Sequence, residues 1–290
     1  QQLSFSYTPQ HKALENITIT IPAGSRVSIV GQTGSGKSTL LRLLCALELP
    51  DEGKVLIDGQ DSASGGQGRR GRAWRAKLRS HVGYVMQRPE RQLFANTVAE
   101  DIAFGPSNQG LSVQEVQKRV EEAIEICGLQ DKRTASPFEL SGGQQRLCAI
   151  AGVLATKPKV LVLDEPTAGL DPHGRQELYR LLSLLNAQGV TIVQVTHSMN
   201  DAANSQIVYV LNQSHLLAAG TPQEIFCRAN QQELRSCGLG LPLALQWAIK
   251  LEEAGFVQAG ELGQPLTLDE LADSLASKYV AKEAYDGSQN

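Results

Sequence analysis

The chain has 290 residues, a formal net charge of −3 and 41% hydrophobic residues. This length and hydrophobic content fit a globular protein with one large α/β domain and a small additional segment. The slightly acidic balance, with a pI of about 6.0, argues against a nucleic-acid-binding protein, which usually carries an excess of basic residues. No apolar run approaches the roughly 20 residues that a membrane-spanning helix needs, so any membrane role must come through a partner.

The cysteines and the chain start indicate a compartment. The five cysteines contain no Cys-x-x-Cys pair, and Cys45, Cys127 and Cys148 fall in apolar helical patterns. We therefore expect small buried hydrophobic residues in a reducing cytosol rather than a metal or redox site. The sequence shows no signal-peptide pattern. It also lacks an initiator Met, so we expect a trimmed N-terminus.

The first 86 residues alternate between apolar strands and one helix. Residues 26–30 form a short apolar strand that runs into a glycine loop, and the leucines of residues 37–47 recur at helical spacing. Asp58-Gly59 after the strand at residues 54–57 is a hairpin signal. We expect further strands at residues 13–21 and 81–86.

Residues 62–79 are rich first in Gly and Ser and then in Arg. This composition predicts a flexible, solvated loop. The alternative is that its basic part contacts lipid headgroups.

The rest of the chain begins its helices with capping signals and carries two buried strands. The capping patterns are Thr97 with Glu100, Ser112 with Glu115, and Thr221 with Glu224. Residues 160–163 and 191–195 are continuous apolar runs of the kind found in parallel sheets. Strands and helices alternate between them, which implies a parallel core sheet.

The composition changes after Phe226. Residues 242–254 have an apolar face at helical spacing, and Thr267 with Glu270 caps a further helix beyond a linker at residues 260–264. We interpret residues 228–290 as a small helical domain. It either packs on the main domain or holds a second subunit.

A complete phosphate loop matches the pattern G-x-x-x-x-G-K-[ST]. Its glycines let successive backbone N–H groups point into one concavity, and the positive end of the following helix adds to the attraction for phosphate. Lys37 can bridge the β- and γ-phosphates, and the Ser38 hydroxyl can bind Mg²⁺. The nine residues are Gly31, Gln32, Thr33, Gly34, Ser35, Gly36, Lys37, Ser38 and Thr39.

Two carboxylates follow the apolar strand at residues 160–163. Asp164 would hold Mg²⁺ through water, and Glu165 would orient or deprotonate a water that attacks the γ-phosphate. Such a pair is common after strands, so its weight comes from the phosphate loop upstream.

Three further residues are candidates for nucleotide contacts. Gln87 follows a predicted strand and offers an amide oxygen to Mg²⁺, and His197 follows the strand at residues 191–195, where it can donate to the γ-phosphate. Tyr7 is placed to stack on adenine. The alternative for Tyr7 is a half-buried strand aromatic.

The pentapeptide Leu140-Ser141-Gly142-Gly143-Gln144 is a second phosphate-binding element. Ser141 can cap a helix, and the two glycines leave the first backbone N–H groups uncovered. Two such elements in one nucleotide-binding unit suggest that one of them serves a second subunit's nucleotide.

The order of these motifs over residues 1–227 resembles an ATP-binding cassette (ABC) ATPase. The resemblance implies an α/β fold with a phosphate-loop parallel core sheet, an antiparallel β subdomain and an α-helical signature subdomain at about 88–158. The small helical domain at residues 228–290 follows it. Two cassettes then close head to tail, with ATP and Mg²⁺ between one phosphate loop and the partner's Ser141, Gly142, Gly143 and Gln144. Asp171 would lie at the dimer seam.

A narrower resemblance is to the ATPase subunits of energy-coupling factor (ECF) transporters, which import vitamins or transition-metal ions. It rests on residues 87–106, on residues 149–155 and on the C-terminal stretches 240–242 and 267–271. Residues 164–171 look more like the second of two paralogous ATPases. Such a subunit is peripheral on the cytoplasmic side of the cell membrane. Its partners are a second ATPase (a paralogue or itself), a transmembrane coupling subunit and a substrate-binding membrane subunit, with no nucleic acid.

The same resemblance places a coupling groove on residues 89–106. Apolar residues would receive a helix of the membrane subunit and acidic residues would pair with its basic ones; the alternative is that the apolar residues pack internally. The groove residues are Glu90, Leu93, Phe94, Val98, Glu100, Asp101 and Ile102. Arg88 departs from the apolar residue that this family often carries there.

Two other functional classes remain open. One is a subunit of a cobalt/nickel-type or conventional ABC transporter, and the other is a non-transport ABC ATPase. The second class usually carries a coiled-coil insertion or two cassettes, and this sequence has neither.

Overall fold

The computed structural model describes residues 1–8, 10–66 and 68–287, and the chain forms two compact units. The first unit comprises Gln1–Arg26 and Gly36–Val195, and the second comprises Val27–Ser35 and Thr196–Asn290. The division falls inside the phosphate loop, so residues of one motif belong to both units. Among the described residues, no helix is long and apolar enough to cross a membrane.

A parallel sheet forms the centre of the first unit. Its strands are β6 (Val82–Val85), β7 (Val160–Asp164) and β8 (Thr191–Val195), with β7 in the middle. The register pairs Val85 with Leu163, and the two strands run in the same direction. The residues that follow β6 and β7 therefore meet at one edge of the sheet.

Two antiparallel hairpins form the predicted β subdomain. Strand β1 (Leu3–Thr8) pairs with β2 (His11–Ile17), and β4 (Leu56–Ile57) pairs with β5 (Gln60–Asp61) around the Asp58-Gly59 turn. β2 ends before the predicted residue 21. Helix α1 (Lys37–Leu44) also ends early, because Ala46 adopts a left-handed backbone with φ of 51°.

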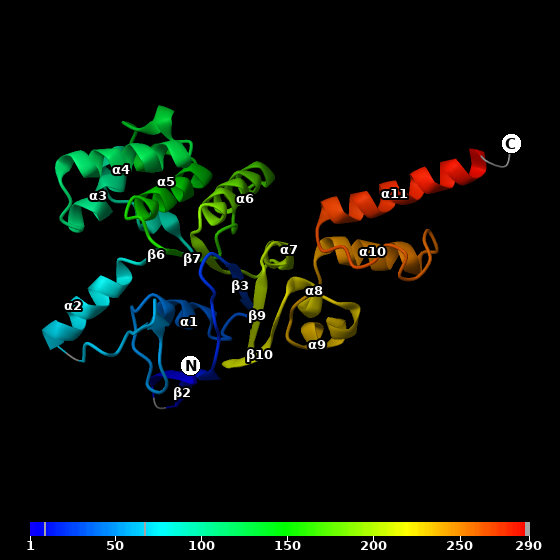
Figure 1. Cartoon of the computed structure of the whole chain (residues 1–290), viewed down its shortest axis with the longest axis horizontal. Coiled ribbons are helices and arrows are strands. Elements are labelled where there is room, and N and C mark those ends of the chain that lie inside the picture. Colours follow the sequence, from blue (N-terminus) through cyan, green and yellow to red (C-terminus); the bar gives the residue numbers. More distant parts are fainter. Residues whose placement is uncertain (9, 67, 288–290) are drawn as a thin grey trace. The chain divides into compact units, whose positions relative to one another are not determined.

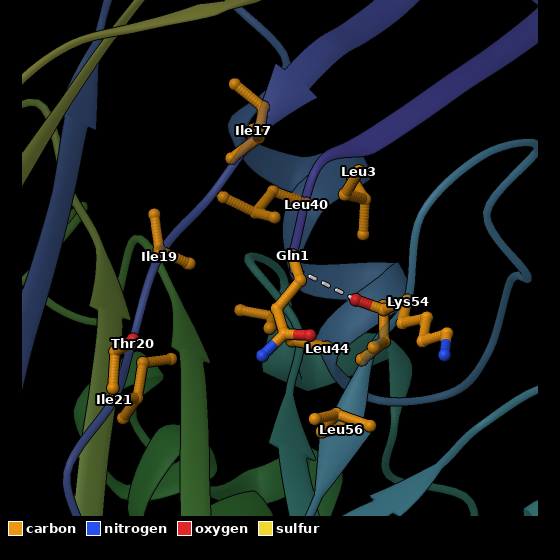
Figure 2. A pocket seen from close by; sticks show the side chains of 11 residues that line it. Gln1, Leu3, Ile17, Ile19, Thr20, Ile21, Leu40, Leu44, Lys54 and Leu56 are labelled. Carbon is orange, nitrogen blue, oxygen red and sulfur yellow. Dashed lines mark hydrogen bonds between the residues drawn. The ribbon is translucent and has the colours of Figure 1, made fainter.

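An apolar cavity of about 220 Å³ lies beside α1 in the first unit. Figure 2 shows Leu3, Leu40 and Leu44 around it, with the Gln1 amino group donating to the Lys54 carbonyl oxygen at 3.0 Å. Its lining contains no acidic side chain and no residue of the phosphate loop. This cavity is therefore not the predicted nucleotide site.

Three helices of the first unit form the predicted helical subdomain, which Figure 1 shows as one group in green. They are α3 (Val98–Asn108), α4 (Val113–Ile126) and α5 (Gly142–Leu154), followed further along the chain by α6 (Pro172–Ala187). The predicted capping box at Thr97 is complete. At Ser112 it is half formed, because the Glu115 carboxylate accepts from Arg119 at 2.8 Å instead.

The basic segment before β6 differs from the prediction. Residues 68–79 form helix α2 (Gly68–Arg79) rather than a loop. Gly71 and Leu78 on one face are buried, and the Trp74 indole N–H donates to the Asp61 carbonyl oxygen at 2.9 Å. These contacts order a segment whose Gly- and Arg-rich composition gave no apolar periodicity.

The second unit carries a mixed sheet. Strand β3 (Arg26–Gly31) is parallel to β9 (Ile207–Asn212), which is antiparallel to β10 (His215–Gly220). The helices are α7 (Met199–Ala203), α8 (Pro222–Ile225), α9 (Gln231–Ser236), α10 (Leu243–Glu253) and α11 (Leu268–Gly287). Single 3₁₀ turns lie at Pro89–Arg91, Gln130–Lys132, Pro137–Glu139 and Arg228–Asn230.

The C-terminal helices share a core with the strands of the second unit. Leu234 and Leu245 belong to one buried cluster with Val30 and Val208. Helices α10 and α11 lie side by side, as Figure 1 shows in orange and red. Residues after 228 therefore pack against β3 and β9, while the domain boundary at residue 227 stays a prediction.

The cysteines confirm the expectation of buried hydrophobic residues. Cys45, Cys127 and Cys148 are buried, and burial raises the pKa of each thiol to about 12. A thiol with such a pKa stays protonated and unreactive at neutral pH. The described residues contain no group of three or more His, Cys, Asp or Glu side chains that could hold a metal ion.

Candidate functional site: a nucleotide-binding edge and a signature helix

The phosphate loop has the backbone geometry that its motif requires. A Cβ atom at Gly31 would lie 2.3 Å from the Leu211 carbonyl oxygen, and one at Gly36 would lie 2.4 Å from the Ala13 carbonyl oxygen. Only glycine fits at both positions. Gly36 precedes helix α1 in a left-handed conformation and gives it no side-chain cap, so no side-chain cap occupies the first N–H groups of α1.

The side chains of Ser35 and Lys37 are the parts of the loop that bear on anion binding. The Ser35 hydroxyl is buried and finds no hydrogen-bond partner within the described part of the chain. Burial lowers the pKa of Lys37, while the charges of Glu165 and Asp164 oppose that shift. Lys37 is thus a buried cation that lies within reach of the charges of both carboxylates, and its role in binding phosphate stays a prediction.

Tyr7 lies beside the first turn of α1. Its hydroxyl is 3.3 Å from the Thr39 hydroxyl oxygen, and its ring packs edge-on against Phe5 at 5.0 Å between centroids. The side chain is 52% exposed. The ring is thus both anchored and accessible, and its stacking on adenine stays a prediction.

Asp164 is the last residue of β7 and Glu165 follows it, so both lie at the carboxyl end of this central strand. Both are buried, at 7% exposure each. The Glu165 N–H donates to the Val195 carbonyl oxygen at 2.9 Å, and its backbone has a left-handed φ of 49°. A non-glycine residue in that region carries local strain, which concentrates at functional sites.

Gln87 is exposed and lies two residues after β6, whose last residue Val85 pairs with Leu163 of β7. Sequence reasoning missed Gln92, which fixes the backbone here. Its side-chain oxygen accepts from the Met86 N–H at 2.8 Å, and its amide donates to the Tyr84 carbonyl oxygen at 3.3 Å. The Tyr84 hydroxyl lies 3.5 Å from Asp164 Oδ2, and burial with the Asp164 charge raises the Tyr84 pKa.

Gly31–Ser35 and His197 belong to the second unit. His197 is exposed and follows Thr196, whose N–H donates to the Ile29 carbonyl oxygen at 3.2 Å. Ile29 lies in β3, two residues before the phosphate loop begins. The backbone that carries His197 is therefore bonded to the strand that feeds the loop.

The signature pentapeptide begins helix α5 as predicted. The Ser141 hydroxyl accepts from the Gln144 N–H at 3.3 Å, and the Gln144 side chain accepts from the Ser141 N–H at 3.1 Å. Ser141 and Gly142 are exposed, and no atom lies within 4 Å of a Cβ built on Gly142. The first turn of α5 thus faces open space.

Arg146 joins this helix to the loop after Glu165, which the sequence did not suggest. Its guanidinium donates to the Pro166 carbonyl oxygen and, at 2.9 Å, to the Ala168 carbonyl oxygen. Burial lowers the pKa of Arg146. Asp171, at the end of this loop, caps α6 by accepting from the Gly174 N–H at 2.7 Å and is exposed.

The structure corrects part of the predicted coupling groove. Leu93, Val98 and Ile102 are 5%, 0% and 0% exposed and belong to the core of the first unit, so they do not line a surface groove. Asp101 is also buried, and its carboxylate accepts from the Phe94 and Ala95 N–H groups at 2.8 and 2.9 Å. Asp101 therefore holds the loop and is not available to a basic partner.

An exposed aromatic pair remains on that surface. Phe94 and Phe104 are 57% and 52% exposed and meet edge-on at 4.7 Å between ring centroids. Glu90 and Glu100 are exposed beside them in the sequence, although Glu100 also completes the Thr97 capping box.

Comparisons with known proteins identify the family of the chain. The family model described as ABC transporter matches residues 14–168. The energy-coupling factor transporter ATP-binding protein EcfA2 of Enterococcus faecalis is 47% identical over 285 residues, covering 96% of each chain. The protein of that name in Streptococcus thermophilus is 43% identical over 281 residues, covering 95% of this chain and 97% of its own.

Solved structures show the same fold. The structure of cbiO1 from Clostridium perfringens, part of the ABC transporter complex cbiONQ, has a TM-score of 0.74 and 34% identity over 87% of this chain and 97% of its own. A dimeric, post-hydrolysis ATP-binding cassette, MJ0796 with ADP and Pi, has a TM-score of 0.68 and 30% identity over 77% of this chain and 97% of its own. The chain therefore belongs to the ABC transporter ATPases, in the group of energy-coupling factor transporter ATP-binding proteins.

Proposed function

We propose that this ATPase powers an ECF-type importer of vitamins or other micronutrients by closing as a head-to-tail dimer and driving a transmembrane coupling subunit. The observation that carries the proposal is the exposed first turn of α5, where Ser141 and Gly142 face open space above a completed capping box. A helix start built to hold an anion, left open in one chain, suits a nucleotide held by a second chain.

The nucleotide is ATP, held through its phosphates by the loop Gly31–Thr39. The buried Lys37 charge and the first N–H groups of α1 favour the negative triphosphate over a neutral ligand. Tyr7 stacks on the adenine ring. Anchoring of the Tyr7 hydroxyl by Thr39 supports this role, because it fixes the ring close to the loop.

The metal is Mg²⁺, whose donors would be the Ser38 hydroxyl, the Gln87 amide oxygen and the Asp164 carboxylate. All three are oxygen donors, which this hard cation prefers. When bound, the ion neutralises charge on the phosphate oxygens. The positive charge of Lys37 interacts favourably with the negative charge of the Asp164 carboxylate.

Hydrolysis depends on Glu165 and His197. Glu165 orients the attacking water and accepts its proton, and its buried, backbone-anchored position holds the carboxylate in one place. His197 donates to the γ-phosphate. Gln87 reports the presence of that phosphate to the segment that follows it.

A second cassette, a paralogue or a second copy, completes the site. Ser141, Gly142, Gly143 and Gln144 bind the nucleotide of the partner, and Asp171 lies at the seam. The Arg146 bonds to Pro166 and Ala168 support coupling between these parts, because the signature helix and the loop after Glu165 must move together. ATP shifts the pair toward closure only by its higher affinity for the closed state.

The coupling subunit docks on Phe94 and Phe104, with Glu90 and Glu100 available for basic residues. Exposed aromatic pairs are typical anchors of protein interfaces. In this proposal the chain is peripheral on the cytoplasmic face of the cell membrane, with a substrate-binding membrane subunit in the same complex and no nucleic acid.

A subunit of another ABC transporter complex, such as a cobalt/nickel-type or conventional one, is the second candidate. The 34% identity to cbiO1 of the cbiONQ complex favours it. The higher identities to the two EcfA2 proteins place the ECF importer first.

Native mass spectrometry of the tagged chain extracted from its own membranes tests the proposal. We expect one complex that contains this chain, a second cassette and membrane-spanning subunits. Recovery of the chain only from the soluble fraction, alone or with nucleic acid, would overturn it. A complex whose membrane subunits belong to a different transporter class would favour the second candidate.

A further inference from the structure

Helix α2 concentrates positive charge on a chain that is acidic overall. The chain has 27 basic and 30 acidic residues, and six of the basic ones lie within Gly68–Arg79. Residues 62–80 contain no Asp or Glu. Solvated helices usually mix both signs of charge, because opposite charges three or four residues apart stabilise them. The basic residues of α2 are Arg69, Arg70, Arg72, Arg75, Lys77 and Arg79.

The exposed basic side chains of α2 lie opposite the face by which this helix is bound to the protein. Gly71 and Leu78 are buried, the Trp74 indole donates to the Asp61 carbonyl oxygen, and a Cβ on Gly71 would lie almost on the Gly66 carbonyl oxygen. Arg69, Arg70, Arg72 and Lys77 are exposed on the remaining surface. The helix is thus held by one side and presents cations on the other.

The outward cations are not neutralised by the protein itself. Among the residues whose side chains the structure describes (1–8, 10, 12–66 and 68–278), no ion pair joins Arg69, Arg70 or Arg72 to an acidic side chain. Lys77 lies over the Trp74 ring at 5.8 Å. By contrast, the basic residues Lys118 and Arg133 of the helical subdomain each have a glutamate partner. The charge of α2 is therefore available to an anionic surface.

We infer that α2 is a docking surface for the anionic lipid headgroups of the membrane beside which this chain works. The inference rests on the proposed function in so far as that function places the chain at a membrane. Cytoplasmic leaflets carry anionic lipids, and a cluster of four to eight Lys and Arg residues on a helix is the pattern that binds them. Trp74 is half-buried and its indole N–H is bonded to the Asp61 carbonyl oxygen, so the ring is held to the protein and the contact is with headgroups.

Vesicle co-flotation of the full-length chain tests the inference. We expect binding to vesicles of phosphatidylcholine mixed with phosphatidylglycerol and none to phosphatidylcholine alone. The triple variant Arg69→Gln, Arg70→Gln, Arg72→Gln is expected to bind at least about tenfold more weakly, and high salt to release the wild-type chain. The matched control removes three basic residues elsewhere, Lys118→Gln, Lys132→Gln and Arg180→Gln, and is expected to bind as the wild type does.

Energy transfer locates the contact on the molecule. The chain has two tryptophans, so Trp74 alone reports in a Trp247→Phe background. We expect transfer from Trp74 to a dansyl-labelled headgroup on anionic vesicles and none on phosphatidylcholine vesicles. Equal binding of the triple variant and the control, equal binding to neutral vesicles, or no transfer from Trp74 on vesicles that the chain binds would overturn the inference.

Two further outcomes are distinguished by the same preparations. Tighter binding of the chain to duplex or single-stranded DNA than to anionic vesicles would overturn the lipid assignment in favour of nucleic acid. The triple variant is also expected to keep its place in the extracted transporter complex. Loss of vesicle binding with an intact complex therefore concerns α2 alone, whereas absence of any complex concerns the proposed function.

Discussion

Gly238, just after helix α9, lies against the Gln32 side chain of the phosphate loop. It ends α9 with a left-handed φ of 64°, and a Cβ atom there would lie 2.3 Å from the side-chain nitrogen of Gln32. Both residues belong to the second unit. The Gln32 side chain thus rests directly on the backbone of the C-terminal segment.

Substitution of Gly238 by Ala is expected to disturb the loop as well as the helix end. The left-handed backbone alone lowers the free energy of unfolding by about 1–2 kcal/mol for a residue with a Cβ. Because the new Cβ also displaces Gln32, we expect the Kd for ATP to rise severalfold. Gly255→Ala is the matched control, because Gly255 has a φ of 75° with nothing within 4 Å of its Cβ position. Thermal unfolding and ATP titration measure the two effects.

The outcome for Gln32 decides the interpretation. In a Gln32→Ala background, Gly238→Ala should no longer weaken ATP binding beyond the control. If Gly238→Ala and Gly255→Ala lose stability alike and neither changes the Kd, the contact has no part in nucleotide binding.

The sequence indicates candidate residues for the chemistry, whose roles stay predictions, but not the residues that support them. Glycines, Lys37 and the carboxylate pair stand in contiguous motifs, because each must present particular atoms to one ligand. Gln92 bonds to backbone groups of Tyr84 and Met86, and Arg146 bonds to carbonyl oxygens in the loop after Glu165. No local sequence pattern indicates such partners. Asp101 was assigned to a partner protein although its carboxylate serves two backbone N–H groups.

At the scale of elements, helix starts were predicted best. Ser141, Thr97 and Thr221 form complete capping boxes, because these depend only on residues three apart. Helix α2 was missed, since tertiary anchors such as the Trp74 bond to Asp61 order it rather than a periodic apolar face. Part of the groove prediction was wrong, because apolar spacing does not say whether Leu93 faces inward or outward.

The aromatic pair on the helical subdomain carries the coupling prediction. Phe94→Ser together with Phe104→Ser is expected to abolish recovery of the membrane subunits with the tagged chain, because the exposed rings provide the apolar anchor. ATP affinity should change less than about twofold, since neither ring supports the core. Phe256→Ser removes another exposed ring, 78% exposed on the C-terminal part, and should leave the complex intact.

The Arg228–Glu252 ion pair is expected to make the stability of the protein depend on pH. Two bonds of 2.5 Å join the guanidinium to the carboxylate, whose side chain is 5% exposed, and they lower the pKa of Glu252 below its usual 4.5. The stabilisation is therefore present above about pH 4.5 and is lost as pH falls through the lowered pKa.

Glu252→Gln is expected to reduce the free energy of unfolding by about 1–2 kcal/mol at neutral pH. The difference from the wild type should shrink as pH falls below 4.5, because the wild-type carboxyl then loses its charge as well. Urea unfolding at several pH values measures it. If the difference in the free energy of unfolding stays constant with pH, packing and not the ion pair stabilises the contact between Arg228 and helix α10.

At the scale of the whole molecule, the proposed function makes this chain one of two cassettes. In that proposal the phosphate loop, the carboxylate pair and His197 serve one nucleotide, while the exposed start of the signature helix α5 serves the nucleotide of the partner. The motifs and their order predicted this class of molecule from the sequence. Which partners complete it follows from the assembly, and no single chain specifies them.

ATP hydrolysis by the extracted complex tests the central claim most directly. With Glu165→Gln in this chain, we expect ATP to stay bound and the turnover rate to fall at least about a hundredfold, because the group that activates the attacking water is gone. Glu139→Gln, at an exposed position of the same unit, is the control and should keep the wild-type rate. A near-normal turnover rate of Glu165→Gln in the assembled complex would contradict the account.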